Sequence, residues 1–181
     1  MEKVKAVITG VGGYVPEYIL TNEELARMVD TNDEWITTRV GIKERRILKE
    51  EGLGSSYLAR KAAKQLIQKT GVDPQTIDCV ICATTTSDYR FPSNASIVIG
   101  KLGLTNAHGF DVSCACCGFL YTVDMASTFI ESGRYKRVMV IAAEKMSSIV
   151  DYQDRQTCVL FGDGAAAVML EATTAEGGGF Q

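Results

Sequence analysis

The sequence predicts an α/β fold with a mainly parallel sheet that carries helices on both faces. Short β-rich runs alternate with helical patterns along the 181 residues, and parallel strands joined by crossover helices give this order. The segment CVICATTT at residues 79–86 opens with a continuous apolar run of strand length, as expected for a strand buried on both faces. Several of the 17 glycines stand where a strand is expected to meet a helix.

The N-terminal segment predicts one strand and two capped helices. Residues 3–16 are typical of a strand that runs into a glycine turn at residues 10–13. Thr21 is followed three residues later by Glu24, and Thr31 by Glu34. Each pair has the spacing of a capping box, so we expect helices to begin just after Thr21 and Thr31.

The next segment predicts an amphipathic helix over residues 55–71. Leu58, Ala62, Leu66 and Ile67 share one face of it, and Gly71 is suited to its C-terminal end. Residues 72–78 predict a short helical turn, with an aspartate cap followed by a proline in the first position.

The remaining elements complete the alternation of strands and helices. We expect a strand at residues 79–86, a helix after Pro92, a strand at 107–113, a helix at 116–133 and strands at 137–145 and within 158–172. The helix at 116–133 is apolar around most of its first turns, which predicts a position at the centre of the fold. The polar, glycine-rich segment 173–181 is typical of a linker or surface turn.

Composition excludes several classes of protein. A net charge of −3 and a pI near 5.3 do not suit a nucleic-acid-binding protein, which needs a basic face. No stretch has the length and apolar character of a membrane span, and the N-terminus has no signal-peptide pattern. We therefore expect a cytoplasmic protein whose six cysteines are reduced thiols.

Three cysteines lie within four positions, at Cys114, Cys116 and Cys117, and they allow three interpretations. Structural zinc takes four ligands, usually as two spaced pairs, so this spacing does not favour a metal site. Buried thiols also act as small apolar groups. A thiol at a helix N-terminus instead meets unpaired N–H groups that favour the thiolate and can hold an oxyanion, and Gly118 leaves room for a substrate. The residues alone leave open whether one of the three is catalytic, and which.

The segment FDVSCACCGFLY at residues 110–121 resembles the nucleophile segment of β-ketoacyl-acyl-carrier-protein synthase III, a thiolase-like condensing enzyme. The segments TNDEWITTRVGIKERR, FPSNAS, VDYQDRQT and LFGDGAAAVML are also similar to family segments and occur in the family order. The resemblance covers essentially the whole chain. It implies one βαβαβαββ half of a layered αβαβα architecture, with residues 1–181 forming the N-terminal thiolase-like domain.

The resemblance also assigns site residues. Cys116 falls on the nucleophile, while Cys114 and Cys117 fall on small, packed positions. The family residues that hold coenzyme A correspond to Thr31, Trp35, Arg39 and Arg155. Phe91 corresponds to the residue that closes the acyl pocket across a dimer interface. Read without the resemblance, Trp35 and Phe91 could serve as core residues, and the arginines as solvated surface charges.

The implied activity is the decarboxylative condensation of a short acyl-coenzyme A with malonyl-acyl-carrier protein, in a homodimer that uses no cofactor or metal. The family's histidine and asparagine have no counterpart in this chain, because His108 does not match, so we expect them in a second half outside residues 1–181. A non-catalytic or split half that pairs with a partner is the alternative. A thiolase or a hydroxymethylglutaryl-coenzyme A synthase is another, and the DEWI segment argues against it.

Overall fold

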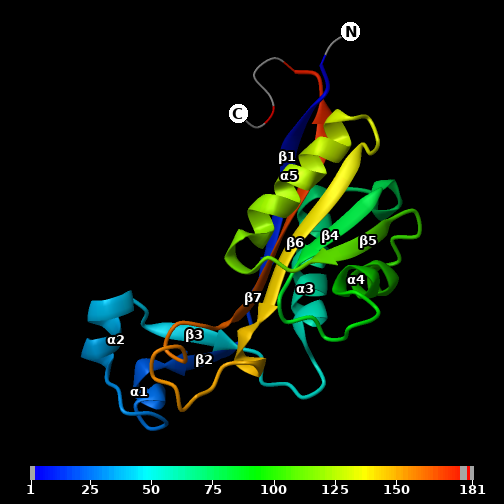
Figure 1. Cartoon of the computed structure of the whole chain (residues 1–181). Coiled ribbons are helices and arrows are strands. Elements are labelled where there is room, and N and C mark those ends of the chain that lie inside the picture. The colour runs from blue at the N-terminus through cyan, green and yellow to red at the C-terminus, as the bar shows by residue number, and fades with distance from the viewer. Residues whose placement is uncertain (1–2, 176–178, 180–181) are drawn as a thin grey trace.

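The computed structural model describes residues 3–175 and residue 179. A five-stranded sheet with helices on both faces forms the larger part of the molecule, and a two-stranded sheet with two short helices forms a smaller lobe at one end (Figure 1). The α/β class predicted from the sequence is therefore confirmed.

The elements have the following bounds: β1 Lys5–Tyr14, β2 Tyr18–Thr21, α1 Asn22–Leu25, α2 Asp33–Val40, β3 Glu44–Ile47, α3 Ser55–Thr70, η1 Pro74–Thr76, β4 Cys79–Ala83, α4 Asn94–Leu102, β5 His108–Val112, η2 Ala115–Cys117, α5 Gly118–Glu131, β6 Arg137–Lys145, η3 Met146–Ser148 and β7 Asp163–Thr173. The helix predicted at 55–71 is α3, which ends at Gly71 in the left-handed conformation. The short turn predicted at 72–78 is η1, capped by Asp73.

The strand order in the large sheet is β1-β7-β6-β4-β5. Strand β4 pairs parallel with both β5 and β6, whereas β7 pairs antiparallel with both β6 and β1. Of these five strands, β7 alone runs against the shared direction. The mainly parallel, mixed sheet expected from the sequence is thus confirmed.

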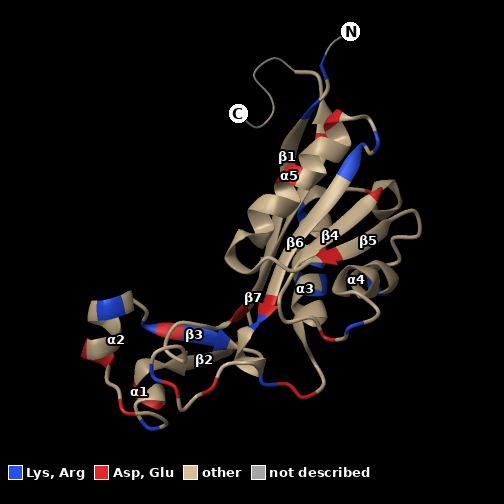
Figure 2. Cartoon of the chain, in the orientation of Figure 1, with Lys and Arg blue, Asp and Glu red and all other residues tan. Residues whose placement is uncertain are grey.

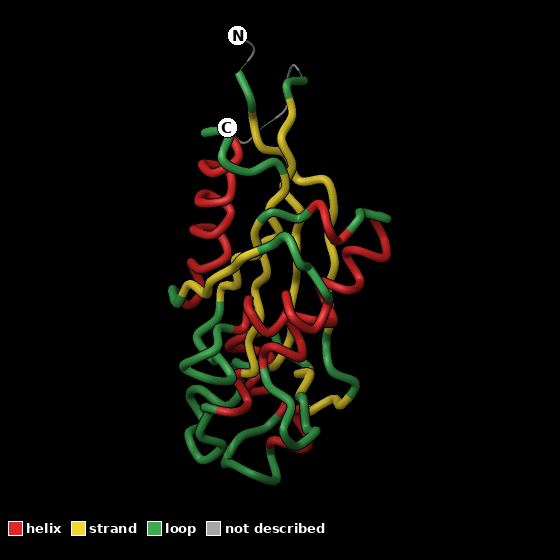
Figure 3. The backbone as a smooth tube through the Cα atoms, turned by 90° about the vertical axis from the view of Figure 1, so that its right-hand side faces the viewer, coloured by secondary structure: helices red, strands yellow, loops and turns green. Residues whose placement is uncertain are grey.

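Helices lie on both sides of the large sheet (Figure 3), and an apolar layer of side chains fills each interface. One layer contains buried residues of α3 and α4, such as Ala62, Leu66 and Val98, against one face of the sheet. The other contains Ala126 and Ile130 of α5 against the opposite face. All five residues of β4 are buried, which explains why its sequence is apolar without alternation.

The glycine turn predicted at residues 10–13 is wrong, because β1 continues through it to Tyr14. The glycines allow α3 to lie close against the strand. A Cβ atom at Gly12 would be 2.4 Å from the Ala62 carbonyl oxygen, and one at Gly10 would be 2.3 Å from Thr70 Cγ2. In β1 these glycines therefore mark close approach of two elements and not a turn.

The central position predicted for the helix at 116–133 does not hold within this chain. Helix α5 covers one face of the sheet and turns its other side outward, where Leu120 is 67% and Tyr121 54% exposed. Its first residues are apolar all round although only one side meets the sheet. Figure 2 shows this helix mostly without charges, in contrast to the charged elements of the small lobe.

The small lobe contains a β2–β3 pair that the sequence did not indicate. These four-residue strands pair antiparallel from Tyr18 opposite Ile47 to Thr21 opposite Glu44. Buried Leu20, Leu25 and Ile36 form its core together with Cys158 and Val159, which come from the segment between β6 and β7. The lobe therefore joins two parts of the chain that are far apart in sequence.

Most of the glycine-rich segment predicted at 173–181 lies outside the described residues, and Thr173 is the last residue of β7. Within the described part of the chain, the helices lack the combination of length and apolar character that a membrane span requires.

Candidate active site

Helix α2 of the small lobe carries two of the predicted site residues, Trp35 and Arg39, and a third, Thr31, lies just before its N-cap. Its N-cap is Asn32, whose side chain accepts a hydrogen bond from the Trp35 N–H at 2.7 Å. The capping box predicted for Thr31 and Glu34 is therefore wrong by one residue. Asn32, which follows Thr31, is the N-cap, and asparagine is at least as favourable there as threonine. The Thr31 Oγ1 atom is buried and has no hydrogen-bond partner within the described chain.

Trp35 is half-buried, and two guanidinium groups lie close to its indole ring. The Arg39 Cζ atom is 4.7 Å from the centroid of the indole ring, and the Arg155 Cζ atom is 4.8 Å from it. Arg155 also donates to the Asp30 carbonyl oxygen at 3.1 Å and lies 3.8 Å from the Asp30 carboxylate. The fold thus brings together Trp35, Arg39 and Arg155, although Arg155 comes from a distant segment. A planar, π-rich and cationic surface of this kind suits a nucleotide.

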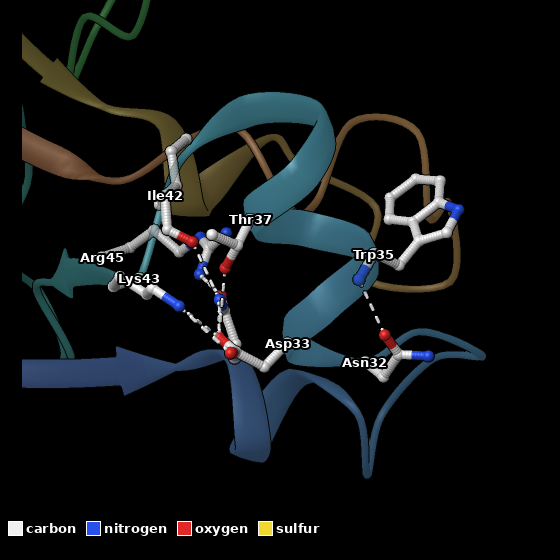
Figure 4. Close-up of polar contacts among 8 residues, drawn as sticks. Asn32, Asp33, Trp35, Thr37, Ile42, Lys43 and Arg45 are labelled. Carbon is white, nitrogen blue, oxygen red and sulfur yellow. Dashed lines mark hydrogen bonds and ion pairs between the residues drawn. The ribbon is translucent and has the colours of Figure 1, made fainter.

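A network of polar contacts holds the start of α2, at Asp33 (Figure 4). Asn22 donates to the Asp33 carboxylate at 2.8 Å, and Lys43 donates to the same carboxylate at 3.1 Å. These two contacts, the Asn22 hydrogen bond first, lower the pKa of Asp33. The network was missed from the sequence, because Asn22 and Arg45 belong to polar stretches whose burial depends on tertiary contacts.

Cys116 lies in the turn between β5 and α5. It is the middle residue of η2, and α5 begins two residues later at Gly118. Ala115, just before it, has φ 47°, which is uncommon for a residue with a side chain. The Cys116 side chain is exposed and lines a cavity of about 340 Å³ together with Ala83, Phe119, Ala142 and Glu144.

The six cysteines differ in their exposure to solvent. Cys79, Cys82 and Cys158 are buried, and burial raises the pKa of each, to about 11 for Cys79. Cys114 is half-buried. Cys117 is exposed, so the packed position predicted for it is wrong within this chain. Among the described residues, no three His, Cys, Asp or Glu side chains are arranged to hold a metal ion.

Gly118 has a different role from the predicted one. It is buried, and a Cβ atom there would be 3.1 Å from Ala83 Cβ, so the glycine lets α5 start close to the end of β4. It does not open space for a substrate. The close contact instead holds the Cys116 turn against the carboxyl end of a central strand.

Glu144 also lines the Cys116 cavity and is held by hydrogen bonds to the segment that follows β4. Its carboxylate accepts hydrogen bonds from the Thr85 N–H at 2.7 Å and from the Thr86 hydroxyl. The Thr86 hydroxyl lies 2.8 Å from that of Ser55, which is fully buried. The segment after β4 is therefore tied to the end of β6 beside the candidate nucleophile.

The two other residues considered from the sequence lie apart from this cavity. Phe91 is 89% exposed, in the segment before α4, and does not line the cavity. His108 is the first residue of β5, whereas the Cys116 turn follows the end of that strand. The His108 Nε2 atom is 2.9 Å from the Tyr135 hydroxyl.

Comparisons with known proteins show which family the chain resembles. The family model described as 3-oxoacyl-[acyl-carrier-protein (ACP)] synthase III matches residues 110–181. The chain is 67% identical to a β-ketoacyl-[acyl-carrier-protein] synthase III of Phocaeicola vulgatus, over 98% of this chain and 53% of the relative. It is 53% identical to one from Chlorobaculum tepidum, over 97% of this chain and 54% of the relative.

Solved structures show the same similarity. The 3-oxoacyl-[acyl-carrier-protein] synthase III of Aquifex aeolicus superposes with a TM-score of 0.91 at 49% identity, over 94% of this chain and 55% of that chain. The synthase III of Thermus thermophilus gives a TM-score of 0.90 at 40% identity. The chain spans about half the length of the curated relatives it matches.

Proposed function

Because this chain belongs to the β-ketoacyl-[acyl-carrier-protein] synthase III family, with the thiolase-like fold, we propose that it carries the nucleophile and the nucleotide-binding surface of such an enzyme. The observation that carries the proposal is that one chain has both an exposed thiol, Cys116, and an indole contacted by two guanidinium groups. Thiol and nucleotide surface are the two features that an enzyme acting on acyl-coenzyme A needs.

The proposed reaction has two stages. In the first, the Cys116 thiolate attacks the thioester carbonyl of a short acyl-coenzyme A, the acyl group moves to Cys116, and coenzyme A leaves as its thiol after taking a proton. In the second, malonyl-acyl-carrier protein loses carbon dioxide, and the resulting enolate attacks the acyl-cysteine carbonyl. A 3-oxoacyl-acyl-carrier protein forms and Cys116 is released as the thiolate. Neither stage needs a metal or a redox cofactor.

The small lobe is the proposed site for coenzyme A. The adenine would stack on Trp35, and Arg39 and Arg155 would meet its phosphates or its ring. The buried Thr31 Oγ1 atom, which lacks a partner in the described chain, supports this placement, because an unsatisfied buried hydroxyl next to a π-rich surface is suited to a ligand contact.

We further propose that residues 1–181 form one domain of a two-part, cytoplasmic, homodimeric enzyme. The exposed apolar side of α5 supports a second part that covers it, which would supply the donors for the enolate. β5 is an edge strand and is therefore open to pairing with a second copy. Phe91, which is exposed, would close the acyl pocket of that copy. The acyl-carrier protein is a substrate partner in this scheme.

Two measurements test the proposal separately. Trp35 is the only tryptophan of the chain, so its fluorescence reports on the nucleotide site, and we expect coenzyme A to quench it in a saturable way. Incubation with radiolabelled acetyl-coenzyme A should place label on Cys116, and Cys116→Ala should remove it while Cys117→Ala keeps it. Label on another residue in the native protein would overturn the assignment of the nucleophile.

A further inference from the structure

Asn22 joins three segments of the small lobe through one buried amide. It is the first residue of α1 and is 2% exposed. Its Nδ2 atom donates to the Asp33 carboxylate at the start of α2 and to the Ile42 carbonyl oxygen after the end of α2, both at 2.8 Å. Its Oδ1 atom accepts from the guanidinium group of Arg45 in β3. Both amide hydrogens are used, so the side chain fixes both ends of α2 at once.

Arg45 extends this connection to the other side of the lobe. It is 4% exposed, and its Nε atom donates to the Val159 carbonyl oxygen at 3.0 Å. In the described part of the chain no carboxylate lies within ion-pair distance of Arg45. Asn22 stands between this buried cation and the Asp33 carboxylate, and its amide dipole contacts both.

The two connected segments carry the residues that meet at the Trp35 ring. Helix α2 carries Trp35 and Arg39, while Val159 lies four residues after Arg155 in the segment between β6 and β7. The route from one segment to the other runs Asp33, Asn22, Arg45, Val159, and each step is a hydrogen bond. A fixed separation of the two segments is what a flat ligand requires when it binds against the indole.

We propose that Asn22 is a positioning residue for nucleotide binding, which sets the separation between the Trp35 indole and the Arg155 segment. The proposal rests on the proposed function, since it assumes that coenzyme A binds at Trp35. Asn22 does not line the stack and acts through α2 and Arg45. Its effect is therefore on coenzyme A affinity and not on the chemistry at Cys116.

The experiment is a fluorescence titration of the whole chain with coenzyme A, read from Trp35. The variants are Asn22→Ala, which removes the amide, and Asn22→Asp, which keeps its size and can accept from Arg45 but cannot donate to Asp33 or Ile42. Asn94→Ala is the matched control, because Asn94 is likewise the fully buried first residue of a helix, α4, in the other part of the molecule. Circular dichroism melting of each variant identifies the temperature at which all are folded.

We expect both Asn22 variants to bind coenzyme A between about 10-fold and 100-fold more weakly than the native chain, the loss typical at metal sites when a residue that orients a binding group is removed. Asn94→Ala should bind as the native chain does, even where its melting temperature falls as far. The rate at which iodoacetamide alkylates Cys116 should be the same in all four proteins.

The possible failures are distinct. A folded native chain that shows no saturable response to coenzyme A would refute the nucleotide site and this proposal with it. A native response that both Asn22 variants share would overturn the positioning role alone. An equal loss in Asn94→Ala would show that global stability, and not the position of α2, controls the affinity.

Discussion

Substitution of Gly12 by alanine tests whether β1 and α3 touch as closely as the fold requires. A Cβ atom at this position would be 2.4 Å from the Ala62 carbonyl oxygen, 2.6 Å from Leu66 N and 2.9 Å from Leu66 Cα. All three atoms belong to the backbone of α3, so no side-chain rotation relieves the contact. The helix and the strand must separate by about 1 Å, the distance needed to reach ordinary contact at 3.4 Å.

The size of the effect follows from what that movement disturbs. Ala59, Ala62 and Leu66 of α3 are fully buried in the apolar layer against the sheet, and moving the helix opens gaps beside all of them. Overpacking typically costs about 1–3 kcal/mol. Because the clash is with a helix backbone, we expect a loss of about 3 kcal/mol in the free energy of unfolding for Gly12→Ala. For a chain of this length the melting temperature should fall by roughly 6–12 °C.

Urea denaturation followed by circular dichroism measures this loss, and Gly13→Ala is the matched control. The neighbouring Gly13 also lies in β1, and its added Cβ atom would meet the Ala165 carbonyl oxygen at an ordinary 3.6 Å. Gly13→Ala should change the free energy of unfolding by less than about 1 kcal/mol, partly because alanine restricts the unfolded chain. A Gly12→Ala protein as stable as its Gly13→Ala counterpart would refute the close contact.

Two further predictions concern thiols and pH. In the folded chain at pH 8, iodoacetamide should modify thiols of residues 114–117 and spare Cys79, Cys82 and Cys158, because burial raises the pKa of these three thiols. Mass spectrometry after digestion measures which cysteines are labelled. Rapid labelling of Cys82 would contradict its position in a buried strand. The lowered pKa of Asp33 means that its carboxylate contributes stability above the unfolded pKa of about 3.9, and that this contribution is lost as the pH falls through the folded value. Asp33→Asn should therefore lose less stability than the native chain on acidification below about pH 4, and Asn22→Ala should raise the pKa of Asp33 in an NMR titration. An unchanged Asp33 pKa in Asn22→Ala would show that Lys43 and Thr37 hold it down without Asn22.

The parts of the fold that could be predicted are those set by local sequence. β4 is buried on both sides, so its apolar run is unbroken, and α3 has an apolar face that ends at Gly71. The failures come from tertiary context. The glycines of β1 have the local pattern of a turn, and only the approach of α3 explains them. Thr31 and Asn32 are both favourable N-cap residues, so local sequence does not decide between them, and in the structure the N-cap is Asn32.

The candidate site divides in the same way. That the thiols of residues 114–117 lie near a helix start could be predicted, because a strand, a turn and a helix follow one another in sequence. Only the family resemblance singled out Cys116 among them. The meeting of Trp35 with Arg155 could not be derived from spacing, because it depends on how the segment between β6 and β7 crosses the small lobe. The family resemblance named both residues, and the fold explains their contact. Asn22 and Arg45 were missed, because nothing local marks a polar side chain for burial.

The pairing of β6 with β7 has a consequence for how the surface around Trp35 can vary. Lys145 at the end of β6 lies directly opposite Asp163 at the start of β7. The chain between them therefore begins and ends at one pair of facing residues in the sheet. The Arg155 segment is thus a loop whose ends are already closed by the sheet. For such a loop, doubling its length costs only about 0.6 kcal/mol of closure entropy. Insertions or deletions there can reshape what lies against Trp35 while the strands beneath keep their register.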